Sequence, residues 1–180
     1  MPREDLNDFE DYLEMARSLL GSYESTGDLW EANEYVNLAL LMRPADPGAW
    51  ILKSQILSSL EDDPAALAAS EMALRRSPKS AEAQYVRAAV LADMERYQEA
   101  LRGIERAFRC LGGGDEWLIE DIYFEKAAIL DALDRADEAL ATFEAGLRRC
   151  PDSALLRSGV EPLKRERMRR TFKVIDGGLD

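Results

Sequence analysis

The sequence of 180 residues contains no histidine and only two cysteines, Cys110 and Cys150. Without histidine, Ser-His-Asp and Cys-His catalysis are excluded, as are zinc sites that depend on imidazole. Two cysteines are too few for a four-cysteine metal cage or for a framework of several disulfides. We therefore expect no metal site and no cofactor. The low cysteine content fits a reducing compartment, and we predict a cytoplasmic location.

Long apolar runs and positive charge are also scarce. No stretch approaches the roughly 18 apolar residues that a membrane span needs, and residues 1–5 lead into no apolar signal segment. Lys and Arg together number 23 against 35 Asp and Glu, which gives a formal net charge of -12. A surface this acidic repels nucleic acid and anionic membranes, so we expect a soluble protein that binds neither.

Ala and Leu, by contrast, are abundant, in a composition that is 47% hydrophobic and 32% charged. Both residues favour the helix, and the alternation of β-branched residues that marks strands is hard to find. The composition therefore predicts an all-α protein. We expect Trp30 and Trp50 to be packing residues of this helical structure.

The sequence repeats itself every 34 residues. Pro44 and Pro78 are 34 residues apart, the same interval leads to Gly112, and the following step to Pro151 is five residues longer. This extra length predicts an insertion near residues 112–119. Small side chains let two helices approach closely, and two columns of them keep the same spacing: Ala32, Ala66, Ala100 and Ala139, and then Ala39, Ala73, Ala107 and Gly146.

Each repeat has the pattern of two helices joined by a short turn. In the third repeat, residues 81–93 and 97–110 are predicted to be helices, because apolar residues of the second segment recur at spacings of three and four. In the second repeat, Asp63 followed by Pro64 predicts an N-cap and the first turn of a helix.

These repeats resemble the tetratricopeptide repeat family. The resemblance is carried by Leu20, Ala32, Ala39 and Pro44 in the first repeat, by Trp50, Ser54, Leu57, Ala66, Ala73 and Pro78 in the second, by Ala88, Leu91, Tyr97, Ala100 and Ala107 in the third, and by Ala127, Leu130, Ala139, Phe143 and Pro151 in the fourth. It implies a right-handed α-solenoid of about four helical hairpins followed by a C-terminal capping helix. We expect a superhelix over residues 1–152, with repeats near 6–44, 47–78, 81–112 and 120–151, and a capping helix and basic tail over 153–180.

In this family, the first helix of each hairpin lines a concave groove that receives a peptide. The resemblance places the candidate groove residues at Ile51, Gln55, Glu82, Tyr85, Ala89, Asp121, Phe124 and Asp131, with Arg17 and Glu14 as the corresponding positions of the first repeat. These side chains predict an acidic groove with aromatic walls, which suits a peptide with basic and apolar residues. Tyr85 and Phe124 are also open to a role in the core between helices.

The chain ends in a basic segment. Residues 162–180 hold six basic and three acidic residues, and the basic residues that we single out are Lys164, Arg165, Arg167, Arg169 and Arg170. Upstream of them, Leu155, Leu156, Val160 and Leu163 are expected to cover the last hairpin, and Pro162 to kink or break the helix. The segment is open to three roles: capping the fold, contacting an acidic partner or nucleic acid, or entering the acidic groove of the same or a neighbouring molecule.

These features together predict a non-catalytic protein–protein interaction scaffold, or adaptor, that binds a peptide segment in its groove. Two alternatives stay open. The first is a peptide chaperone that resembles the small type III secretion class. The second is a self-assembly module, and hence a homo-oligomer, in which the basic tail of one copy occupies the groove of a neighbour.

Overall fold

The computed structural model describes the backbone of residues 8–176 and their side chains, apart from those of residues 166, 167 and 169–176. Within this range the chain forms nine α-helices and one short 3-10 helix, with no strand, which confirms the all-α prediction. The α-helices are α1 (Phe9–Ser22), α2 (Thr26–Met42), α3 (Pro47–Ser59), α4 (Asp63–Arg76), α5 (Ala81–Asp93), α6 (Tyr97–Cys110), α7 (Ile119–Ala132), α8 (Ala136–Arg149) and α9 (Ala154–Asp176), and η2 (Glu116–Leu118) precedes α7.

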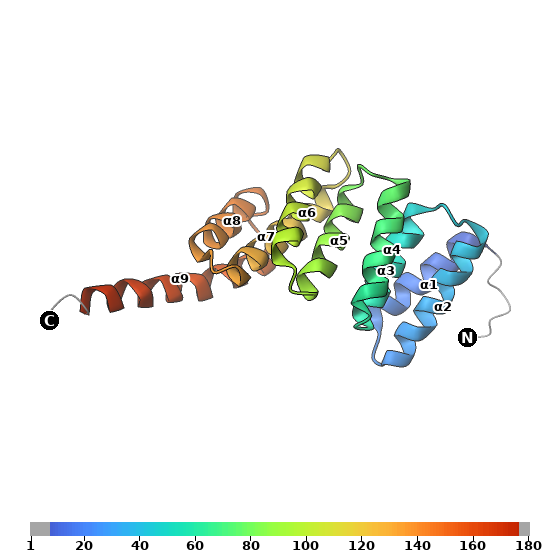
Figure 1. Cartoon of the computed structure of the whole chain (residues 1–180), viewed down its shortest axis with the longest axis horizontal. Helices are drawn as coiled ribbons and strands as arrows, with labels where there is room; N and C mark the ends of the chain where they lie inside the picture. Colours follow the sequence, from blue (N-terminus) through green and yellow to red (C-terminus); the bar gives the residue numbers. More distant parts are fainter. Residues whose placement is uncertain (1–7, 177–180) are drawn as a thin grey trace.

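Consecutive helices pack as hairpins, α1 with α2, α3 with α4, α5 with α6 and α7 with α8. The hairpins follow one another along an elongated row (Figure 1). The odd-numbered helices also contact each other, from α1 to α3, α3 to α5 and α5 to α7, so they form one layer of the row. We call this layer the inner row. The structure is therefore a helical-repeat solenoid, as predicted.

Short polar side chains start most of these helices. The carboxylates or hydroxyls of Asp8, Ser25, Asp46 and Ser80 accept hydrogen bonds from backbone N–H groups in the first turns of α1, α2, α3 and α5. Asp62 caps α4, because its carboxylate accepts from the backbone N–H of Ala65 at 3.2 Å. The prediction of Asp63 as this N-cap was wrong by one residue, since Asp63 is already helical.

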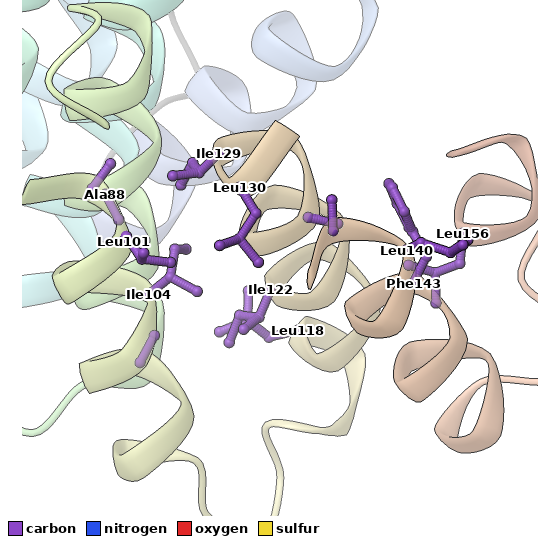
Figure 2. Close-up of a cluster of buried hydrophobic side chains, with 14 of the residues drawn as sticks. Ala88, Leu101, Ile104, Leu118, Ile122, Ile129, Leu130, Leu140, Phe143 and Leu156 are labelled. Atoms are coloured by element: carbon purple, nitrogen blue, oxygen red, sulfur yellow. The ribbon is translucent and has the colours of Figure 1, made fainter. Parts of the chain in front are cut away.

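The two columns of small residues lie where helices cross. Ala32, Ala66, Ala100 and Ala139 have no exposed surface. At Gly146, in the other column, a Cβ atom would lie 2.9 Å from side-chain atoms of Leu156 and Tyr123. Larger side chains at these positions would force the helices apart. The resulting core extends from α5 and α6 to α9, and Figure 2 shows many of its side chains.

The first half of α9 covers the last hairpin. Leu156, Val160 and Leu163 are buried against α7 and α8, whereas Leu155, which we expected to join them, is 38% exposed. Of the two outcomes that we expected at Pro162, a kink or a break, the break is excluded, because α9 continues through this residue. Beyond it, the second half of α9 projects from the row of hairpins (Figure 1).

The two tryptophans of the first two repeats differ in burial. Trp50 is half-buried and donates a hydrogen bond from Nε1 to the carbonyl oxygen of Pro44 at 2.9 Å. Trp30 is 58% exposed on α2, so its expected role as a packing residue was wrong. The 34-residue spacing fixes where each tryptophan lies within its repeat. It does not show whether another helix covers the side chain, so it could not predict this difference in burial.

Gly103 of α6 offers a test of the close helix contact. A Cβ atom at this residue would lie 2.8 Å from the Cβ of Ala88 on α5, and neither atom can move without shifting a helix. We expect Gly103→Ala to lower the free energy of unfolding by about 1–3 kcal/mol in urea titrations. Gly21→Ala is the matched control, since nothing lies within 4 Å of its Cβ position, and it should stabilise by about 0.5–1 kcal/mol through helix propensity. A Gly103→Ala protein as stable as the wild type would contradict the tight contact.

Candidate functional site

The inner row brings predicted groove residues from different helices together. A hollow of about 250 Å³ is lined by Arg17 of α1, by Gly48, Ile51 and Gln55 of α3, and by Glu82 of α5, among others. Ile51 is only 5% exposed and packs against Ala83 and Val86 of the next hairpin. It therefore forms the apolar floor of the hollow, while the polar side chains stand around it.

The charge of Glu82 is influenced from both sides of this hollow. Burial raises the pKa of the Glu82 carboxyl, the positive charge of Arg17 lowers it, and the negative charge of Asp115 raises it further. Asp115 lies in the inserted loop before α7, where its carboxylate accepts a hydrogen bond from the backbone N–H of Gly112 at 2.8 Å. The insertion thus adds an acidic group beside the inner row, and Asp115 was not among the predicted site residues.

A second acidic group of side chains lies further along the inner row, on α5 and α7. Burial, and then the charge of Asp93, raise the pKa of Glu125 to about 7. Burial and the neighbouring Glu120 raise the pKa of Asp121. Burial raises the pKa of Tyr85 as well, with further contributions from Asp121, Glu125 and Asp93. We call Tyr85, Asp93, Asp121 and Glu125 the acidic cluster.

Sequence reasoning did not include Glu125 among the site residues. Glu125 follows Asp121 by four residues on α7, a spacing that places two side chains on the same helical face. That spacing was the available signal. The depth of Glu125 could not be read from the sequence, because α5 supplies part of its surroundings, including Asp93.

The remaining predicted residues of the inner row differ in their surroundings. Phe124 is half-buried, and its ring meets the ring of Phe143 on α8 edge-on, with centroids 5.7 Å apart. Much of this ring is therefore engaged in the core. Ala89 is half-buried, and Asp131 is exposed near the end of α7.

The basic tail is described only in part. Arg165 is exposed, and Lys164 lies 4.0 Å from the carboxylate of Glu144 on α8. The side chains of Arg167, Arg169 and Arg170 lie outside the described residues.

A hollow of about 590 Å³ lies elsewhere, between α6, α7 and α8, and none of the predicted groove residues lines it. Several of its charged groups already have partners within the fold. Arg135 pairs with Glu138 at 2.7 Å, and the ammonium group of Lys126 lies 5.7 Å from the ring centroid of Phe108. The acidic cluster differs, because Asp93 raises the pKa of Glu125, and the three carboxylates raise the pKa of Tyr85. We therefore place the candidate site on the inner row.

Among the described residues there is neither a cluster of metal ligands nor a membrane-spanning helix. No group of three Cys, Asp or Glu side chains among those that the structure describes is arranged to hold a metal ion. No helix in the same range is both long and apolar enough to cross a membrane.

Comparisons with known proteins agree with this architecture. The sequence pattern of the tetratricopeptide repeat matches residues 120–153, which contain α7 and α8. The crystal structure of TTC0263, a thermophilic tetratricopeptide repeat protein of Thermus thermophilus, superposes with a TM-score of 0.77 at 22% sequence identity, over 89% of this chain and 84% of that chain. The protein has the tetratricopeptide-repeat fold. This confirms the resemblance predicted from the sequence.

Two further tetratricopeptide-repeat structures are similar. MamA superposes with a TM-score of 0.67 at 15% identity, over 92% of this chain and 86% of that chain. YrrB, described as having an unusual peptide-binding site, superposes with a TM-score of 0.61 at 21% identity, over 91% of this chain and 79% of that chain. No curated protein matches the chain in sequence.

The raised pKa of Glu125 predicts a pH-dependent stability of this tetratricopeptide-repeat fold. The folded protein holds the Glu125 proton up to about pH 7, whereas the ordinary value is 4.5. The free energy of unfolding of the wild type should therefore decrease as the pH rises from 4.5 to about 7. Over this range folding must take up a proton that the unfolded chain has already released. We expect Glu125→Gln to raise the free energy of unfolding by about 2–3 kcal/mol at pH 8 and to leave it nearly unchanged at pH 4.5.

Chemical denaturation of wild type and variant at both pH values measures this difference. Glu105→Gln, on the exposed surface of α6, is the matched control and should show no such pH-dependent gain. An equal effect of Glu125→Gln at both pH values would contradict the assigned pKa.

Proposed function

We propose that this protein is a non-catalytic interaction scaffold that binds a peptide segment with basic and apolar residues along the inner row. The observation that carries the proposal is that burial and neighbouring carboxylates raise the pKa values of two carboxyl groups, those of Asp121 and Glu125. Among the described residues, no positive charge offsets this rise at either carboxyl group. A Lys or Arg side chain from a partner would supply the missing charge.

The shape of the inner row supports an apolar component of the same peptide. The hollow between α1, α3 and α5 has Ile51 and Leu52 in its lining, with Gln55 and Glu82 also lining it. An apolar side chain that enters it would lose water-exposed area, and the polar neighbours would orient the peptide. Tyr85, half-buried between the hollow and Asp121, offers an aromatic surface beside the charges.

The comparisons support an interaction role in general terms. Tetratricopeptide-repeat proteins are generally interaction modules, and YrrB, which shares the fold, is described as having a peptide-binding site. The acidic character of the site is a property of this chain. It supports a preference for a basic peptide over one that presents a carboxylate, since like charges in a partly buried site repel strongly.

Selection from a random peptide library, followed by calorimetry on the selected peptides, tests the proposal. We expect selected peptides to be enriched in Lys, Arg and large apolar residues. The double variant Asp121→Asn/Glu125→Gln should bind them at least about tenfold more weakly, which corresponds to about 1.4 kcal/mol. The control Glu105→Gln/Asp137→Asn makes the same chemical changes on α6 and α8 and should bind as the wild type does. Selection of acidic peptides, or equal loss in both double variants, would contradict the proposal.

Binding should also depend on pH. Because the pKa of Glu125 is about 7, this group is largely neutral near pH 6 and charged near pH 8. A cationic peptide favours the charged form, so affinity should rise several-fold over this interval and protons should be released on binding. Calorimetry in buffers of different ionisation enthalpy measures the release. The Glu125→Gln variant should lose most of both effects, and a pH dependence that persists in it would assign the titration to another group.

A further inference from the structure

The outward face of α2 is apolar, although it is exposed. Trp30 is 58% exposed, Leu38 40%, Leu41 78% and Met42 51%. Leu38, Leu41 and Met42 are spaced by three and four residues, so they lie together near the end of the helix. We call these four residues the α2 patch. It lies on an even-numbered helix, outside the inner row and separate from the proposed peptide site.

The other outer helices carry a positive charge at the position that matches Leu41. In the repeat register, Leu41 corresponds to Arg75 of α4, Arg109 of α6 and Arg148 of α8, and all three arginines are exposed. Met42 corresponds to Arg76 of α4, Cys110 of α6 and Arg149 of α8. At Leu41 the first repeat thus exposes an apolar side chain where the other three repeats present a cation to water. A group of exposed apolar side chains of this kind is typical of an interaction site.

The surroundings of the α2 patch define the charge of its partner. Residues 8–43, which contain α1 and α2, hold eight carboxylates and only two arginines. Glu31 and Glu34 lie on α2 itself. Pairing of this patch with the same patch of another copy would bring the carboxylates of both helices together, which is unfavourable. A complementary partner is therefore apolar and basic.

The chain itself contains such a segment, in the second half of α9. Residues 164–176 hold six basic and two acidic residues. Among the side chains that are described there, Arg165 is exposed and Met168 is 59% exposed. This half of α9 projects from the row at the end opposite to α2 (Figure 1), so the two cannot meet within one molecule.

We propose that the second half of α9 in one copy of the protein docks on the α2 patch of another copy. The contact joins two different surfaces, so a pair of copies still has one free surface of each kind, and repetition of the contact gives head-to-tail chains. Apolar contact between Met168 and the α2 patch would be supported by attraction between the basic helix and the acidic first hairpin.

Light scattering of three proteins at low ionic strength tests this arrangement. The wild-type mass should increase over about a hundredfold range of protein concentration and fall again when salt is added. Leu41→Arg introduces the residue that the other three repeats carry, and Arg165→Glu/Met168→Glu reverses charge and removes the apolar contact on α9. Each variant should remain monomeric. An equimolar mixture of the two should give dimers and nothing larger, because one intact surface of each kind is left.

The controls repeat the charge change of Leu41→Arg and the charge reversal of Arg165→Glu elsewhere on the outer surface. They are Ala68→Arg on α4 and Arg102→Glu on α6, and both residues are exposed. Both control proteins should associate as the wild type does. Circular dichroism checks that every variant is folded. A wild type that stays monomeric overturns the proposal. Association that is lost in the α9 variant but kept in Leu41→Arg also overturns it, since the tail would then bind another surface, such as the inner row. Association lost only in Leu41→Arg overturns it in favour of pairing between α2 helices.

Discussion

Close contact between helices at small residues is the constraint on which the structure depends. Ala32, Ala66, Ala100 and Ala139 are fully buried, and Gly103 faces Ala88 with no room for another carbon atom. Because these contacts recur at a fixed interval, successive hairpins repeat the same geometry. The repetition brings every odd-numbered helix against the next one and creates the inner row.

The electrostatics of the inner row follow from this spacing. The contact of α5 with α7 places Asp93 close enough to Glu125 to raise its pKa, while burial removes part of the water that would otherwise stabilise both charges. Burial of a carboxylate near another carboxylate is unfavourable for folding and favourable for binding a cation. Under the proposed function, stability and recognition are thus opposed at Asp121 and Glu125, as is common where a protein keeps a site for a partner.

The repeat spacing predicted the helical pairs, and residues 81–93 and 97–110 are helices as expected. It could not predict how deeply each side chain lies, because depth depends on the neighbouring hairpin. Ile51 was expected on the groove surface and forms its floor, since α5 covers it. Phe124 was open to two roles and packs on Phe143. The identity of the partner, and with it the chaperone and self-assembly alternatives, is not encoded in the spacing at all.

The central claim is that the inner row receives the selected basic peptide, at a site separate from the α2 patch used by the proposed association of copies. Titration of isotopically labelled protein with a selected basic peptide, followed by amide chemical shifts, tests it most directly. We predict that the largest shifts fall on α1, α3, α5 and α7, around Glu82 and the acidic cluster, and that they shrink in Asp121→Asn/Glu125→Gln. Shifts confined to α2, α4, α6 or α8 would contradict it.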